Sequence, residues 1–211
     1  MTDLATAATH DHDHDHHDDA DRRLHRHAHD LALIAVFAAL IAVTGLLPDI
    51  STGVGVPYSA QTLAVLLAGA ALGARRGFLA VLLYLAGGAI GLPIFAGGSS
   101  GFGHFSGVTG GYLVAFPLAA ALCGYIVQRN AARSTDFTLV FSAGLLSSFA
   151  LIHTLGPLGI AWRADLPIKE AFIADAAYFP GDIIKNVVMA LIATQLHRAF
   201  PDLLARPAPA R

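Results

Sequence analysis

Apolar residues in this chain gather into six runs that are separated by short polar or glycine-rich connections. The runs cover residues 31–47, 58–73, 77–92, 112–127, 137–162 and 178–196. A helix that crosses a bilayer needs about 20 mostly apolar residues, and no Asp, Glu, Lys or Arg occurs from Gly77 to Gln128. The pattern predicts an all-α integral membrane protein with six transmembrane helices, of which the one over residues 58–73 is short for a full span.

The composition also favours a membrane protein. Of the 211 residues, 55% are hydrophobic and 13% are charged, a balance too apolar for an ordinary soluble domain of this size. We expect one compact transmembrane domain over residues 31–197, a polar tail over residues 1–30 and a loose C-terminal tail over residues 198–211. The single cysteine, Cys123, lies inside the fourth run, so no intrachain disulfide can form.

The polar N-terminal tail contains a run of alternating histidine and aspartate from His10 to Asp19. Such a low-complexity tract cannot bury a core, and we expect it to be disordered when free. Imidazole and carboxylate groups together can hold a transition metal loosely, and the candidate ligands are His12, His14, His16 and His17. The alternative, which we favour, is a solvated tail with incidental metal affinity.

The distribution of basic residues predicts the orientation in the membrane. Six spans put both termini on one side. That side would carry Arg22, Arg23, Arg26, Arg75, Arg76, Arg129, Arg133, Arg198, Arg206 and Arg211, and the other side only Arg163 and Lys169. Because cytoplasmic loops are enriched in Lys and Arg, both termini are expected in the cytoplasm. The loop after the third run and the start of the sixth would then face outward.

An acid and a base open the sixth run. Asp182 and Lys185 are three residues apart and therefore share a helix face. A charge facing lipid costs about 2.5–3.5 kcal/mol, so both side chains should face the protein interior, where such a pair indicates a ligand or ion site. The alternative is an internal ion pair in which the two groups only neutralise each other.

The connection over residues 94–111 is rich in glycine and aromatic residues and carries no formal charge. A loop of this length in so compact a protein predicts a lid or a pocket wall. A phosphate cradle is disfavoured because no Gly-Lys-Ser/Thr ending is present, and the chain has no Walker-type loop with which to use ATP itself. His104 and His153 are isolated, so we expect no enzyme, and we interpret His153 as a packing residue.

These features together predict the kind of ligand. An outward-facing pocket with one lysine and one aspartate suits a small, partly apolar organic acid, because lysine pairs with a carboxylate and aspartate accepts hydrogen bonds from N–H groups. The apolar body could be covered by Phe95, Phe102, Phe105 and Tyr112.

Several longer motifs occur in a recognisable order. They are Val56–Pro57 with Gln61–Thr62–Leu63 and Leu66–Leu67–Ala68–Gly69, Gly88 to Gly98, Thr109 to Leu113, and Pro180 to Lys185. On these motifs the chain resembles the BioY family, the biotin-specific substrate-binding (S) components of energy-coupling factor (ECF) transporters, over about residues 31–196. The resemblance implies a six-helix S-component bundle in the cell membrane of a prokaryote that captures biotin from outside, with the loop after the third helix as its lid.

The resemblance also implies roles for particular residues. Lys185 would face the biotin carboxylate or neighbouring polar atoms, and Asp182 would accept hydrogen bonds from ligand N–H groups. Ser99 occupies a lid position where the family can present a longer side chain such as asparagine. The other implied substrate-binding residues are Phe105 as a lid aromatic, Gln61, Tyr112, Gly98 and Phe95.

For partners, the resemblance implies a transmembrane T subunit and a separate pair of ATPase subunits that hydrolyse the ATP. The T subunit would contact small residues of the first helix at the spacing Ala35/Ala39 and Ala38/Ala42. No cofactor and no nucleic acid are expected, and homo-oligomer formation stays open. The competing hypotheses are an S component for another small vitamin and a metal-ion transporter that uses the His-rich tail.

Overall fold

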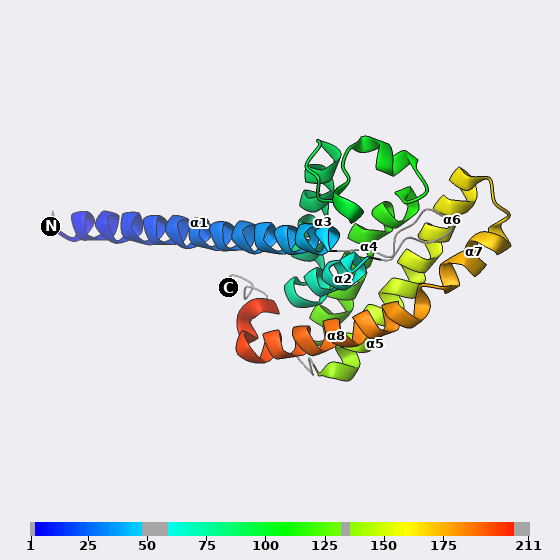
Figure 1. Ribbon diagram of the computed structural model, residues 1–211. Coiled ribbons are helices and arrows are strands. Elements are labelled where there is room, and N and C mark those ends of the chain that lie inside the picture. Colours follow the sequence, from blue (N-terminus) through cyan, green and yellow to red (C-terminus); the bar gives the residue numbers. More distant parts are fainter. Residues whose placement is uncertain (1–2, 48–58, 132–135, 205–211) are drawn as a thin grey trace. The chain divides into compact units, whose positions relative to one another are not determined.

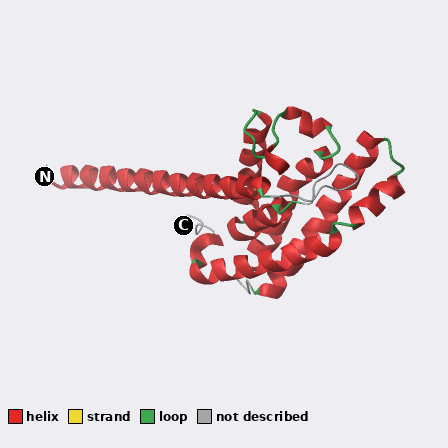
Figure 2. Cartoon of the chain, in the orientation of Figure 1, coloured by secondary structure: helices red, strands yellow, loops and turns green. Residues whose placement is uncertain are grey.

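A computed structural model describes the backbone of residues 3–47, 59–131 and 136–204, and the side chains of these ranges from Arg23 onward. Helices make up most of this part of the chain, and it contains no strand beyond one isolated bridge between Phe95 and Ser99 (Figures 1 and 2). The chain divides into two units, Met1–Leu33 and Ile34–Arg211.

The first helix, α1 (Asp3–Leu46), starts far earlier than the sequence predicts. Residues 3–30, expected to be disordered, are helical. No Gly or Pro precedes Gly45, so nothing in the tail interrupts a helix that the apolar run has already nucleated, and propagation costs much less than nucleation. The predicted weak metal ligands His12, His14, His16 and His17 lie outside the residues whose side chains are described.

The unit Ile34–Arg211 contains the end of α1 and the remaining helices (Figure 1). These are α2 (Gln61–Leu72), α3 (Ala74–Ala89), α4 (Gly110–Asn130), α5 (Phe137–Ser147), α6 (His153–Ala164), α7 (Ile168–Ala176) and α8 (Phe179–Ala199). Each apolar run of the sequence therefore coincides with a helix, and the fifth run contains two, α5 and α6, joined by the π-helical turn η3 (Ser148–Ile152).

Helix α4 lies at the centre of the packing. It contacts α2, α3, α5 and α6, while α2 also packs on α8. The close approach of α2 to α4 depends on Gly69, because a Cβ atom there would overlap the carbonyl group of Ala120. Small residues let helix backbones approach in this way inside a membrane.

Three helices in the described ranges are long and apolar enough to cross a membrane, namely Arg23–Leu46, Gly110–Asn130 and Phe137–Ala164. A fourth span results if α7 and α8, which are bent by 52° relative to each other, count as one. Helix α2 is apolar but only 12 residues long. The all-helical membrane class is thus confirmed, whereas the six-span count and the cytoplasmic termini stay predictions.

Two details differ from what the sequence suggests. Gly156–Pro157, a pair that often interrupts a helix, lies inside α6, and the irregularity of the fifth run lies upstream in η3. The C-terminal tail is not loose from residue 198: α8 continues to Ala199, and a 3-10 turn, η4 (Pro201–Leu204), follows it. The Arg76 guanidinium donates to the carbonyl of Leu203, and Leu204 is buried, so apolar burial and one charge-assisted hydrogen bond hold this turn.

Candidate ligand-binding site

A cavity of about 450 Å³ lies between α2, α4, α8 and the loop that joins α3 to α4. This volume falls in the range of small-molecule sites, about 300–1,000 Å³. Of the predicted substrate-binding residues, the cavity is lined by Asp182, Lys185, Ser99, Gln61, Tyr112 and Phe95. Gly98 and Phe105 are not among its lining residues.

Asp182 and Lys185 form an ion pair at one wall of this cavity. The Nζ atom of Lys185 lies 2.5 Å from Oδ1 of Asp182, and it also donates to the Ser59 carbonyl at 2.8 Å and to the Thr62 hydroxyl at 3.1 Å. The Thr62 hydroxyl in turn donates to Asp182 at 3.0 Å. The two charged groups are thus both an internal ion pair and part of the cavity wall, so the two interpretations of the sequence are compatible.

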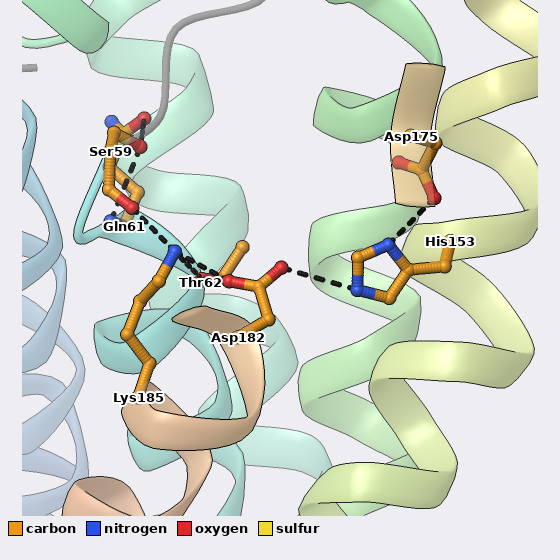
Figure 3. A network of polar contacts seen from close by, with 7 residues as sticks. All are labelled: Ser59, Gln61, Thr62, His153, Asp175, Asp182 and Lys185. Carbon is orange, nitrogen blue, oxygen red and sulfur yellow. Dashed lines mark hydrogen bonds and ion pairs between the residues drawn. The ribbon is translucent and has the colours of Figure 1, made fainter. Parts of the chain in front are cut away.

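The second oxygen of Asp182 faces a histidine. Nε2 of His153 lies 3.2 Å from Oδ2 of Asp182, and Nδ1 of His153 lies 2.8 Å from Oδ2 of Asp175. Figure 3 shows the imidazole between the two carboxylates, with Lys185 on the far side of Asp182. The Tyr112 hydroxyl donates to the other oxygen of Asp175 at 2.5 Å. A chain of polar contacts therefore runs from Lys185 to Tyr112.

Sequence reasoning missed His153 and Asp175. It interpreted His153 as packing and placed Asp175 in a charged connection between apolar runs. The structure puts Asp175 in α7, where its side chain is fully buried. The available signal was the residue itself, an aspartate three positions before the sixth apolar run, where an acidic side chain next to the membrane-embedded segment indicates a polar partner in the protein.

The π-helical turn η3 and two aromatic rings hold His153 in place. His153 follows η3 directly, and the Phe149 and Phe179 rings lie 4.9 and 4.7 Å from its imidazole, measured between centroids. Single π-helical turns inside α-helices often occur at functional sites, because the extra residue shifts the side chains that follow.

The loop between α3 and α4 folds over the cavity around a buried phenylalanine. It contains two 3-10 turns, η1 (Ala96–Gly98) and η2 (Phe102–Ser106). Phe95 makes edge contacts with Tyr84 at 5.6 Å, with His104 at 5.5 Å and with Phe105 at 6.2 Å. The loop therefore forms a cavity wall as expected, and Phe105 supports Phe95 from behind.

The side chains of Ser99 and Gln61 form hydrogen bonds within the protein. The Ser99 hydroxyl donates to the Ala96 carbonyl at 2.9 Å, within the same turn. The Gln61 amide donates to the Tyr84 hydroxyl at 2.5 Å and accepts from the Ser59 hydroxyl at 3.3 Å. Gly98 has a φ of +70°, a left-handed conformation that glycine adopts without strain, so its part in the loop is conformational.

The four alanines predicted to contact a partner differ in exposure. Ala35 and Ala39 are exposed on α1, Ala42 is half-buried and Ala38 is buried. Only the Ala35/Ala39 pair therefore presents a small-residue surface to a neighbour. Among the residues with described side chains, no group of three or more His, Cys, Asp or Glu residues could hold a metal ion.

The fold and the site define an integral membrane protein that encloses a small-molecule cavity between its helices. Comparison with known proteins narrows the class. The BioY family model matches residues 15–202, and the chain belongs to the BioY family. This confirms the resemblance found in the sequence and places the chain among multi-pass membrane proteins of prokaryotes.

The alignments with two curated relatives cover almost the whole length of those proteins. The chain is 41% identical over 182 residues to the biotin transporter BioY of Rhizobium etli, covering 84% of this chain and 97% of that protein. It is 42% identical over 189 residues to the biotin transporter BioY of Rhodobacter capsulatus, covering 84% and 98%. These relatives are named as transporters, in agreement with the expectation that the chain is not an enzyme.

A solved structure has the same fold. The crystal structure of the S-component for biotin from an ECF-type ABC transporter superposes with a TM-score of 0.78 at 27% sequence identity, covering 82% of this chain and 93% of that one. The helical arrangement described above is therefore that of an S component.

Proposed function

We propose that this chain captures biotin from outside the cell and mediates its uptake as the S component of an ECF-type transporter. The observation that carries the proposal is the Asp182–Lys185 pair in the wall of a 450 Å³ cavity, in a chain whose relatives are named biotin transporters. Biotin has a polar ureido ring, an apolar ring and chain, and a carboxylate, so it needs both polar and apolar walls.

The cavity offers both kinds of wall. The lining includes the polar residues Ser59, Gln61 and Thr62 with the Asp182–Lys185 pair, and the apolar side chains of Phe95, Leu113, Phe116 and Ile152. Small-molecule sites typically combine mostly apolar walls with a few polar groups that fix the orientation of the ligand.

The short distance between Asp182 and Lys185 favours contact of this pair with the ureido ring of biotin over contact with its carboxylate. An acceptor and a donor 2.5 Å apart must meet the same end of the ligand. The ureido ring places N–H donors beside a carbonyl acceptor, which suits Asp182 and Lys185 together. A ligand carboxylate would meet the negative charge of Asp182. We therefore assign the ureido ring to this pair rather than the carboxylate, which is one of the two alternatives that the sequence resemblance implies for Lys185.

Calorimetry on the detergent-purified protein tests the function and this assignment. Asp182→Ala and Lys185→Ala should each weaken biotin binding by about 2 kcal/mol or more, the scale of losing a buried charged partner. Lys169→Ala and Asp202→Ala, at exposed positions, serve as matched controls. Biotin amide, which lacks the carboxylate charge, should be equally sensitive to Lys185→Ala. Wild-type protein that binds no biotin but binds another vitamin in a competition panel would refute the proposed substrate.

Transport would require the partner subunits that an ECF-type system implies, since the sequence contains no Walker-type loop. We propose that the exposed Ala35/Ala39 pair contacts the transmembrane T subunit and that ATP is hydrolysed only by the ATPase subunits. Ala35→Leu and Ala39→Leu should reduce co-purification with a T subunit and leave biotin binding unchanged. Val36→Leu, at an exposed position of the same helix, is the control.

A further inference from the structure

His153 lies between two carboxylates and does not itself line the cavity. Its side chain is 2% exposed, that of Asp175 is fully buried, and that of Asp182 is 8% exposed. The Nδ1 contact with Asp175 at 2.8 Å is a well-directed hydrogen bond. The Nε2 contact with Asp182 at 3.2 Å is an ion-pair distance without hydrogen-bond alignment.

The geometry has a consequence for the charge of the ring. Each ring nitrogen lies within ion-pair distance of a carboxylate oxygen, and only the doubly protonated imidazole carries a hydrogen on both nitrogens. A neutral ring would turn a bare lone pair toward one of the two anions. With the imidazolium form, two buried carboxylates are balanced by two cations, His153 and Lys185, which is the condition under which buried charge is tolerated.

The imidazole also joins two helices that meet at a bend. Asp175 belongs to α7 and Asp182 to α8, and the axes of these helices are bent by 52°. His153 contacts both from the start of α6, and the Tyr112 hydroxyl on α4 fixes the far side of Asp175. The Asp182 side chain is therefore contacted directly by His153 of α6 and Thr62 of α2, and Asp175 of α7 and Tyr112 of α4 act on it only through His153.

We propose that His153, oriented by Asp175, is a positioning residue that holds Asp182 in the direction in which it accepts hydrogen bonds from the ligand. The inference rests on the proposed function, because it assigns a ligand-binding role to Asp182. The Nε2 contact compensates the charge of Asp182 without an aligned hydrogen bond between the two groups. His153 acts through Asp182 and needs no contact with the ligand.

A merely structural role for His153 would make different predictions. The ring packs between Phe149 and Phe179, and packing alone would be kept by any flat side chain of similar size. Positioning through charge, in contrast, depends on the ring proton that faces Asp182. The two roles are thus separated by a measurement that follows this proton.

The first measurement needs no ligand. In full-length protein with ¹⁵N-labelled histidine, the signals that His153→Gln removes identify the His153 ring. They should have the shifts of a doubly protonated imidazole, and Asp182→Asn and Asp175→Asn should each change them, whereas His29→Gln at an exposed position should not. Signals of a neutral ring, or signals that do not respond to Asp182→Asn, would overturn the proposal.

The second measurement is biotin affinity as a function of pH. The titratable and charged groups that face His153 are Tyr112 on α4, Asp175 on α7, and Asp182 with its partner Lys185 on α8. Wild-type affinity should fall as rising pH removes the imidazolium proton. His153→Gln should bind biotin about ten- to a hundredfold more weakly near neutral pH and lose this pH dependence.

The remaining variants distinguish a failure of the positioning role of His153 from a failure of the proposed substrate. Asp175→Asn keeps both His153 and Asp182, and should give a smaller loss of affinity, which provides a test if His153→Gln does not fold. A pH profile in His153→Gln that runs parallel to the wild type would refute the positioning role. If the wild type binds no biotin while the His153 signals still respond to Asp182→Asn, the proposed substrate is wrong and the coupling between the two residues stands.

Discussion

The hydroxyl of Tyr112 on α4 donates a hydrogen bond to the carboxylate of Asp175 on α7 at 2.5 Å, and the Asp175 side chain is completely buried. The two residues are 63 positions apart in the sequence. One oxygen of Asp175 accepts a hydrogen bond from the Tyr112 hydroxyl, and the other faces Nδ1 of His153. The Tyr112 hydrogen bond therefore helps to fix the carboxylate that orients the His153 ring. This relationship ties the cavity wall to the helix that precedes α8.

Removing the Tyr112 hydroxyl should destabilise the protein. Tyr112→Phe leaves a buried carboxylate oxygen without its donor, a loss of about 1–3 kcal/mol. For a protein of this size we expect the midpoint of thermal unfolding in detergent to fall by about 2–12 °C. Tyr125→Phe is the matched control, because Tyr125 is exposed and its hydroxyl accepts a hydrogen bond from the exposed Arg129. Equal midpoints for the two variants would contradict the assignment of this hydrogen bond.

The Asp182–Lys185 pair should behave as a buried ion pair in a double-mutant cycle. Lys185→Met alone leaves the Asp182 charge with less compensation and should cost about 3–5 kcal/mol of stability. Adding Asp182→Asn removes that charge and should recover part of the loss, although biotin binding stays impaired. Thermal unfolding of the two single variants and the double variant measures the coupling. Strictly additive effects would indicate that the two groups do not interact.

The close packing of α2 on α4 should not tolerate a side chain at Gly69. The added methyl group of Gly69→Ala would overlap the Ala120 carbonyl, and overpacking of this kind costs about 1–3 kcal/mol. Gly103→Ala is the control, since an added Cβ there meets no atom within 4 Å. We expect a lower unfolding midpoint for Gly69→Ala only. A stabilised Gly69→Ala variant would show that the helices can separate without cost.

The loop over the cavity should depend on Phe95 more than on its other aromatic residues. Phe95 is 2% exposed and contacts Tyr84 and His104, whereas Phe102 is 72% exposed. Phe95→Ala should cost about 3–5 kcal/mol and raise the rate of biotin release, because the wall it forms loses its packing. Stopped-flow or competition measurements of release would test this. A similar effect of Phe102→Ala would show that the packing of this loop does not depend mainly on Phe95.

Much of the fold followed from local patterns. The positions of the helices within the apolar runs, the membrane class and the shared helix face of Asp182 and Lys185 depend on hydrophobicity and on spacing along one helix, which the sequence contains directly. The helical start of α1 was missed, because the low-complexity His/Asp tract was judged by its polarity, and a helix continued from a neighbouring apolar run needs no core of its own.

The composition of the candidate site could be predicted only in part. Gly98 and Phe105 belong to the loop but do not line the cavity, since their direction depends on how the 3-10 turns pack on Phe95. The turn Pro201–Leu204 was likewise expected to be loose, whereas its Leu203 carbonyl accepts a hydrogen bond from the Arg76 side chain, more than 120 positions earlier. No local pattern carries such information.

The sequence by itself therefore determined that the six apolar runs are helical, that they belong in a membrane, and that an acid and a base share one face of the last helix. Only the tertiary structure decided that His153, Asp175 and Tyr112 join that acid in one network. Its contacts link residues that are 22 and 63 positions apart and come from four different helices. The physical reason is that hydrophobicity and periodicity act within a segment, whereas the partner of a buried polar group is set by how separate helices pack.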